Sequence, residues 1–187
     1  MKSDMLPRLL QPMNGEPWDL EAYIKRGGYE AWQQCIKGNS PDKIVRELKH
    51  ALMRGRGGAG FPTGLKWEKV LHHRVKERYF VCNAGEHEPG TFKDRYLIKH
   101  FPHQLLEGCL IAAYTVNAQK SYIYLNAEFK EAKLHLQKAM DEARQQGYLG
   151  KNVFGSRVDL DIEIFDGHGS YVAGEETAML ESMQGRP

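Results

Sequence analysis

Arg54-Gly55-Arg56-Gly57-Gly58-Ala59-Gly60-Phe61-Pro62-Thr63-Gly64-Leu65-Lys66-Trp67 is the stretch around which the rest of the chain is organised. Five of its fourteen residues are glycine, so its backbone can adopt left-handed angles and approach a ligand closely. Consecutive free amides in such a loop form a concave surface that binds anions, above all phosphates. Arg54, Arg56 and Lys66 add positive charge, and Phe61 and Trp67 add flat apolar faces. The stretch therefore predicts a nucleotide-binding loop rather than a flexible surface loop with solvated charges.

Residues 55–60 also match G-x-G-x-x-G, the pattern of a dinucleotide-binding Rossmann unit. That pattern has meaning when a strand precedes it and a helix follows. Here Ser40-Pro41-Asp42 is typical of a helix start, with a capping hydroxyl, proline at the first helical position and an acid in the first turn. Apolar residues follow at helical spacing, and we expect Gly55 to end this helix in a left-handed conformation. The sequence thus argues against a standard Rossmann site.

Beyond the glycine stretch, short apolar segments alternate with helical ones. Residues 79–83 predict a buried parallel strand, and residues 121–125 a second strand in the core. Residues 158–164 alternate apolar and acidic side chains, which predicts a half-exposed third strand near an edge of the sheet. Helical segments at 103–116 and 129–147 separate these strands. This alternation predicts an α/β fold, a Rossmann-like parallel sheet flanked by helices.

Acidic side chains follow two of the predicted strands. Glu86 and Glu88 come directly after the first strand, and Glu175 and Glu176 open a helix after a glycine-rich turn that follows the third. Because ligands in open α/β sheets bind beyond the carboxyl ends of the strands, all four are candidate ligand contacts. Each pair also has a simpler interpretation. The first would lie in a solvated turn, and the second would stabilise the positive end of a helix dipole.

Composition limits the classes of function. The chain has 187 residues, enough for one substantial core. Its 26 Lys and Arg nearly balance 24 Asp and Glu, which argues against a nucleic-acid partner. The longest apolar run, Cys109–Val116, is too short to cross a bilayer. Cys35, Cys82 and Cys109 are odd in number and widely separated, so we expect reduced cysteines of a cytosolic protein and no metal site in this chain.

Two parts are expected along the chain. Residues 1–39 predict an N-terminal arm with two short helices, at 19–27 and 29–37. Residues 40–187 predict the nucleotide-binding α/β domain. The aromatic side chains expected to pack the arm onto this domain are Trp18, Tyr23, Tyr29 and Trp32.

Three loops carry a resemblance to a known family: the glycine stretch, Cys82-Asn83-Ala84-Gly85-Glu86-His87-Glu88-Pro89-Gly90-Thr91-Phe92-Lys93-Asp94-Arg95, and Tyr171-Val172-Ala173-Gly174-Glu175-Glu176-Thr177-Ala178. Together they resemble the NADH- and FMN-binding flavoprotein subunits of respiratory complex I. Similar diaphorase subunits serve NAD-dependent formate dehydrogenases and NAD-reducing hydrogenases. The resemblance runs from about Trp18 to the last residue.

The resemblance implies a non-standard FMN-binding domain that oxidises NADH by hydride transfer to FMN. Electrons would then pass to iron–sulfur clusters, with the iron–sulfur subunits of a multi-subunit oxidoreductase as partners. It also implies a cytoplasmic or organellar-matrix location, peripheral to a membrane complex in the complex I case. Neither nucleic-acid binding nor direct membrane insertion is expected.

The resemblance also assigns roles to individual residues. The positions that match FMN contacts are Gly55, Arg56, Gly57, Gly58, Asn83, Glu86, Tyr171, Gly174, Glu175 and Glu176. Phe61 and Lys66 match positions that hold the nicotinamide nucleotide. Glu88 matches an acid near both nicotinamide and flavin, which it would tune. No side chain is expected to act as a general acid or base for hydride transfer.

Two departures from the family pattern are visible. Gly85 stands where the family usually has aspartate, which removes one hydrogen-bond acceptor from the FMN site. Family members also continue past Pro187, with more of the flavin fold, a ubiquitin-like domain and a helical bundle that carries a [4Fe–4S] cluster. We therefore expect a fold that is incomplete at its C-terminus, with the [4Fe–4S] cluster only in the absent region. A diaphorase subunit and a non-catalytic assembly subunit remain as alternatives.

Overall fold

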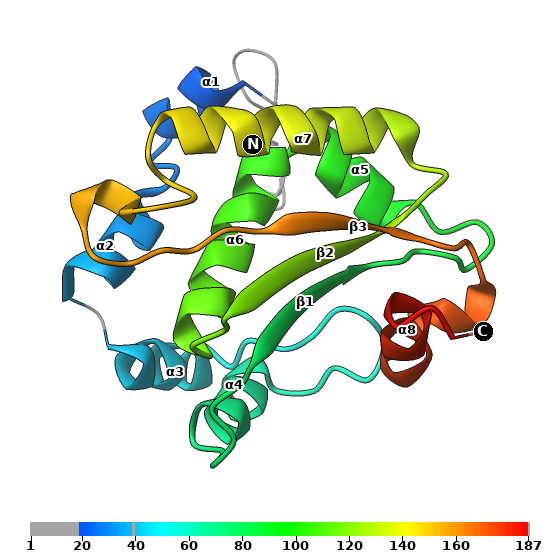
Figure 1. Cartoon of the computed structure of the whole chain (residues 1–187), viewed down its shortest axis with the longest axis horizontal. Helices are drawn as coiled ribbons and strands as arrows, with labels where there is room; N and C mark the ends of the chain where they lie inside the picture. Colours follow the sequence, from blue (N-terminus) through cyan, green and yellow to red (C-terminus); the bar gives the residue numbers. More distant parts are fainter. Residues whose placement is uncertain (1–18, 39, 187) are drawn as a thin grey trace, which may run out of the picture.

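The fold is built on a three-stranded parallel sheet of order β1-β2-β3 (Figure 1). The computed structural model describes residues 19–38 and 40–186. Its strands are β1 (Tyr79–Ala84), β2 (Lys120–Asn126) and β3 (Glu163–Gly167). Both strand pairs are parallel, with Cys82 beside Ile123 and Ile123 beside Ile164. All three strands therefore end at the same edge of the sheet.

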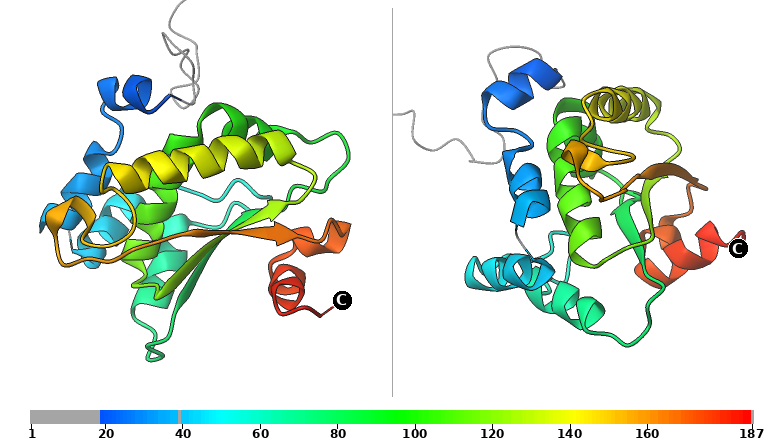
Figure 2. Two further views of the ribbon diagram at one scale, coloured as in Figure 1. Left: turned by 45° about the horizontal axis from the view of Figure 1, so that its top comes forward. Right: turned by 60° about the vertical axis from the view of Figure 1, so that its left-hand side comes forward.

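Helices cover the sheet unequally. The helices are α1 (Leu20–Lys25), α2 (Glu30–Gly38), α3 (Pro41–His50), α4 (Thr63–Leu71), α5 (Lys93–His100), α6 (Pro102–Thr115), α7 (Lys130–Gln145) and α8 (Glu176–Met183), with short 3-10 turns η2 (Val153–Gly155) and η3 (Tyr171–Gly174). Helices α5, α6 and α7 lie over one face, whereas α8 lies on the other side beside the strand ends (Figures 1 and 2). The predicted α/β class, with a parallel sheet and flanking helices, is confirmed.

The core lies between β2 and α6. Leu106 and Leu110 of α6 are fully buried, as are Ile123 and Leu125 of β2. The described part of the N-terminal arm packs into this core through three aromatic side chains, Tyr23, Tyr29 and Trp32. This confirms the packing role predicted for these three. Trp18 and the rest of residues 1–18 lie outside the described residues.

The expected burial of the first strand is wrong. β1 lies at an edge of the sheet and is mostly half-buried, whereas β2 is central and largely buried. A short apolar run does not distinguish a central strand from an edge strand, because both have one face against the core. The third strand does lie at an edge, as predicted, but it begins at Glu163. Within the preceding segment, Leu160 instead forms an antiparallel bridge with Gly150.

The expected helix end at Gly55 is also wrong. α3 ends at His50, and the left-handed residue after it is Leu52, with φ 51°. The amide of Met53 donates to the Leu48 carbonyl at 3.3 Å, which closes the helix end early. Leu52 is 79% exposed, so no packing remains to extend the helix. The glycine stretch consequently begins beyond the end of the helix.

Candidate nucleotide-binding site

The glycine stretch forms a loop between α3 and α4 that is closed at its base. The amide of Gly55 donates to the Phe61 carbonyl at 3.0 Å, and the amide of Thr63 donates to the Met53 carbonyl at 2.9 Å. A Cβ atom added at Gly57 or Gly58 would meet no atom within 4 Å. The loop therefore presents open backbone toward solvent, where a ligand can approach it. A helix precedes the loop, which confirms that this is not the standard Rossmann arrangement.

A close helix crossing fixes the far end of the loop. A Cβ atom at Gly64 would lie 2.6 Å from Lys49 Cγ and 2.9 Å from the Lys49 amide nitrogen. Glycine therefore lets the start of α4 touch the end of α3. The ion pair between Lys49 and Glu68, at 3.0 Å, joins the same two helices.

Phe61 and Lys66 extend the loop toward α8. The Phe61 ring is 47% exposed, and Lys69 Nζ lies 5.6 Å from its centroid. Lys66 Nζ lies 3.3 Å from Glu176 Oε2 at the start of α8. The structure thus brings together two predicted site residues that are 110 positions apart in the sequence.

The acidic loop after β1 is tied to the third loop by Asn83. Its Oδ1 accepts the Gly85 amide at 3.0 Å, and its Nδ2 donates to the Gly174 carbonyl at 2.9 Å. A Cβ atom at Gly174 would lie 3.3 Å from the Gly85 carbonyl oxygen. Asn83, Gly85 and Gly174 therefore form a tight junction between these two loops.

Glu86 caps a helix. It is buried, and its carboxylate accepts the backbone amides of Asp94 at 3.0 Å and Arg95 at 3.3 Å. These amides belong to the first turn of α5, where the helix dipole favours a negative charge. Both oxygens of this carboxylate thus have protein partners near the C-terminal edge of the sheet.

Glu88 forms a second link between the acidic loop after β1 and the η3 turn. Its carboxylate accepts the Tyr171 hydroxyl at 2.5 Å. This hydrogen bond raises the pKa of Tyr171, because the bond is strongest when the phenol keeps its proton. Both side chains are exposed, so an incoming ligand can compete with each of them.

Glu175 and Glu176 have different partners. The Glu175 carboxylate caps α8 by accepting the amides of Thr177 at 2.9 Å and Ala178 at 3.0 Å. These bonds lower the pKa of Glu175. The simpler interpretation of this acid, stabilisation of a helix start, is therefore what the structure shows. Glu176 is the partner of Lys66 instead.

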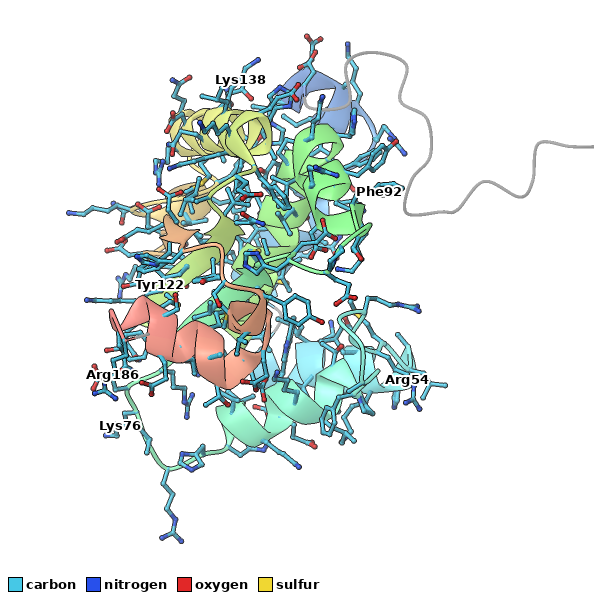
Figure 3. All side chains as sticks on the ribbon, turned by 90° about the vertical axis from the view of Figure 1, so that its right-hand side faces the viewer. Arg54, Lys76, Phe92, Tyr122, Lys138 and Arg186 are labelled. Carbon is cyan, nitrogen blue, oxygen red and sulfur yellow. The ribbon has the colours of Figure 1, made fainter. Side chains whose placement is uncertain are left out.

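The three loops surround the side of the sheet at which its strands end. Figure 3 shows Arg54, Phe92 and helix α8 around this edge. A cavity of about 610 Å³ lies beside η3 and α8 and includes His168, Val172 and Glu175. Another, of about 510 Å³, lies between α5 and the start of α7. Neither includes a residue of the glycine loop, whose outer surface is open.

Tyr124 was not among the predicted site residues, although it lies at the centre of this edge. It is fully buried on β2, and its ring fits against Gly85 and Gly167. A signal was present in the sequence, because Gly85 directly follows β1 and Gly167 ends β3, the two strands that flank β2. Recognising it required the register of the sheet.

The residues at this edge fit a ligand that carries a phosphate and a planar ring. The open amides of the glycine loop and the exposed Arg56 suit a phosphate, and the free face of Phe61 suits a ring. Across residues 19–38 and 40–186 there is no cluster of side chains suited to a metal ion. In the same part of the chain, none of the helices combines the length and apolarity of a membrane span.

The comparisons with known proteins agree on one family. Residues 48–187 match the family model described as the Nuo51 FMN-binding domain. One subunit of the Aquifex aeolicus NADH-quinone oxidoreductase is 45% identical over 167 residues, which are 89% of this chain and 39% of that protein. The corresponding Escherichia coli protein is 45% identical over 172 residues, 91% of this chain and 39% of that protein. The chain thus spans about two fifths of the length of these relatives.

Solved structures show the same fold. A crystal structure of an NAD+-reducing [NiFe]-hydrogenase in the air-oxidised state matches with a TM-score of 0.69 and 39% identity, over 79% of this chain and 24% of that chain. The H2-reduced state matches with a TM-score of 0.70 and 34% identity, over 83% of this chain and 28% of that chain.

Proposed function

The chain belongs to the Nuo51 FMN-binding domain family, and from that membership we propose that it binds FMN non-covalently and takes part in NADH oxidation. The observation that carries the proposal is the glycine loop, whose open amides share one edge of the sheet with the acidic loop and the start of α8. FMN, when bound, supplies the chemistry by accepting a hydride from NADH and releasing electrons singly.

The role of the chain's own residues would be to bind and orient the two nucleotides, FMN and NADH. The free backbone amides of Gly57 and Gly58, together with Arg56, would lie against the flavin and its phosphate-bearing side chain. Gly55 would lie beside them through its backbone, because its own amide is bonded to the Phe61 carbonyl. Phe61 would stack on the nicotinamide nucleotide, because its ring is exposed beside the loop. Glu86 would shape the flavin pocket through its cap on α5 rather than as a free acceptor. Proton transfer by a side chain is not required for the hydride step.

The region between the three loops would contact both FMN and NADH. Glu88 and Tyr171, bonded to each other, would face both the nicotinamide and the flavin. The segment from η3 to α8 would form the third wall of the pocket. Asn83, Gly174 and Glu175 would keep this wall at a fixed distance from β1. Lys66 and Glu176 would form the side of the pocket nearest the NADH phosphates.

The partners in this proposal are iron–sulfur subunits of a multi-subunit oxidoreductase of the NADH:quinone type, in the cytoplasm or organellar matrix. A second candidate is the diaphorase subunit of an NAD-reducing hydrogenase, which the matching crystal structures favour. Identification of the copurifying catalytic subunit distinguishes the two. A quinone-reducing membrane assembly supports the first, and a nickel–iron subunit supports the second.

Anaerobic addition of NADH to the purified native protein tests this function. We expect a flavin absorption band in the visible spectrum that bleaches on addition of NADH. A protein that carries no flavin after purification, and takes up none from added FMN, would be the non-catalytic assembly subunit instead.

Lys66→Ala is expected to raise the Michaelis constant for NADH about tenfold while the flavin content stays unchanged. The variant lacks the Lys66 ammonium group, so NADH would lose a charge-assisted hydrogen bond to its phosphates. The measurement is steady-state NADH oxidation together with flavin absorbance. Lys76→Ala is the matched control, because Lys76 lies on a loop remote from the glycine loop (Figure 3). Lost flavin with an unchanged Michaelis constant would assign Lys66 to FMN.

Gly85→Ala and Gly85→Asp separate two effects at the position where the family usually has aspartate. A Cβ atom at Gly85 would lie 2.9 Å from Tyr124 Cε1, so both variants are expected to lower the melting temperature. The aspartate also adds an acceptor, so Gly85→Asp should retain FMN about tenfold better than Gly85→Ala. Flavin loss on dilution measures this difference. Equal loss from both variants would show that the missing carboxylate does not matter to FMN.

A further inference from the structure

The segment from η3 to α8 carries four of the predicted FMN residues and packs on the sheet through its own small cluster. The buried members of this cluster are Tyr124, Ala173 and Met179, with Val81, Phe165 and Met183 partly buried around them. The main core, which surrounds α6, does not include these residues. The position of the third wall therefore depends on this cluster.

Tyr124 is the centre of the cluster. It stands on β2, the central strand, and is fully buried. Its ring stacks on Phe165 of β3, with centroids 5.8 Å apart and planes inclined by 14°. Its hydroxyl oxygen lies 3.1 Å from Ser182 Oγ near the end of α8. A hydrogen bond at this distance joins the central strand of the sheet to α8.

Two glycines make room for this ring. A Cβ atom at Gly167 would lie 2.6 Å from Tyr124 Cζ, and one at Gly85 would lie 2.9 Å from Cε1. These distances are too short for any side chain unless the buried ring moves. The ends of β1 and β3 are thus built around the Tyr124 ring.

A second attachment lies at the other end of the segment. Asn83 donates from Nδ2 to the Gly174 carbonyl, just before Glu175 and Glu176. Ser182 is near the last residue of α8, so the two attachments hold the helix at both ends. Two fixed points determine where the helix start lies relative to the strand ends.

We propose that Tyr124 is a positioning residue for the flavin site. It sets the distance between the strand ends and the η3–α8 wall, through its bond to Ser182 and its contacts with the two glycines. This inference rests on the proposed function, because its consequence is a change in FMN binding. Tyr124 itself is buried and is not proposed to touch the ligand.

The test uses Tyr124→Phe, Ser182→Ala and the double variant in the native holoprotein, from which FMN is removed and then titrated back. Each single variant removes the same hydrogen bond and leaves the packing nearly intact. We expect each to raise the FMN dissociation constant about three- to tenfold. The double variant should be no weaker than the singles, because both remove one interaction. Ser182→Thr keeps the hydroxyl and should restore most of the affinity.

Tyr122→Phe is the matched control. Tyr122 lies two residues earlier on β2, so its side chain points to the same face of the sheet, and its hydroxyl makes no hydrogen bond among the described residues. Its FMN affinity should equal that of the parent. The visible circular dichroism of bound FMN at saturation should change in Tyr124→Phe and Ser182→Ala and not in Tyr122→Phe.

The outcomes separate the two proposals. Lowered melting temperatures with an unchanged FMN dissociation constant and unchanged flavin dichroism would make Tyr124 a stabilising residue only, and would overturn this inference. Additive losses in the double variant would also overturn it, because the two side chains would then act separately. A parent protein that binds no FMN would instead overturn the proposed function.

Discussion

Glu107→Ala is expected to lower the free energy of unfolding by about 4 kcal/mol. The Glu107 carboxylate is buried on α6 and accepts the backbone amides of Tyr29 at 2.9 Å and Trp32 at 3.0 Å. It also accepts the Tyr23 hydroxyl. Burial, with this carboxylate beside it, raises the pKa of Tyr23, so the phenol keeps its proton and donates. Alanine would leave three donors without an acceptor.

The measurement is denaturant unfolding of the parent and two variants. Glu107→Gln keeps one acceptor oxygen and should lose about half as much stability. Because the three donors lie in α1, in α2 and in the turn between them, we also expect faster hydrogen exchange in residues 20–38 of Glu107→Ala. A loss below about 1 kcal/mol would contradict the role assigned to this carboxylate.

Gly64→Ala is expected to lower the free energy of unfolding by about 2 kcal/mol and to displace the glycine loop. The added Cβ atom would meet the backbone amide of Lys49 at 2.9 Å and the Val45 carbonyl at 3.2 Å. Backbone atoms of a packed helix do not yield as a flexible side chain does, so α4 must move away from α3. Weaker FMN retention should accompany the loss of stability.

Gly108→Ala is the contrasting control. Gly108 lies in α6, and a Cβ atom there would meet nothing within 4 Å. Alanine has the higher helix propensity, so this variant should gain up to about 1 kcal/mol. The same chemical change thus has opposite signs at two helical glycines. Equal effects at both positions would contradict the close crossing of α3 and α4.

The parallel sheet and most helices could be predicted from the sequence because their signals are local. Ser40 and Pro41 mark the start of α3, and Ser40 does cap it. The apolar run of β2 and the periodicity of α7 likewise depend on nearby residues alone. The edge position of β1 could not be predicted in this way. It depends on which strands pair, and that is set by contacts between distant parts of the chain.

The candidate site could be predicted as a set of loops and not as a set of contacts. Glycine content and charge located the three loops. The partners of their acids were not readable, because Glu86 caps a helix that begins seven residues later and Glu176 pairs with Lys66 across the fold. Tyr124 was missed for a related reason. Its significance comes from Gly85 and Gly167, at the ends of the two neighbouring strands, which the register of the sheet brings to the Tyr124 ring.

Hydrogen–deuterium exchange with and without FMN tests most directly whether the three loops form one flavin site. We expect FMN to slow amide exchange in residues 54–61, 83–92 and 171–178 together, and to leave exchange in the remote loop at residues 72–78 unchanged. Protection of the glycine loop would place the flavin on its open amides. Protection confined to other parts of the chain, with the glycine loop exchanging as fast as before, would contradict a flavin site formed by these three loops.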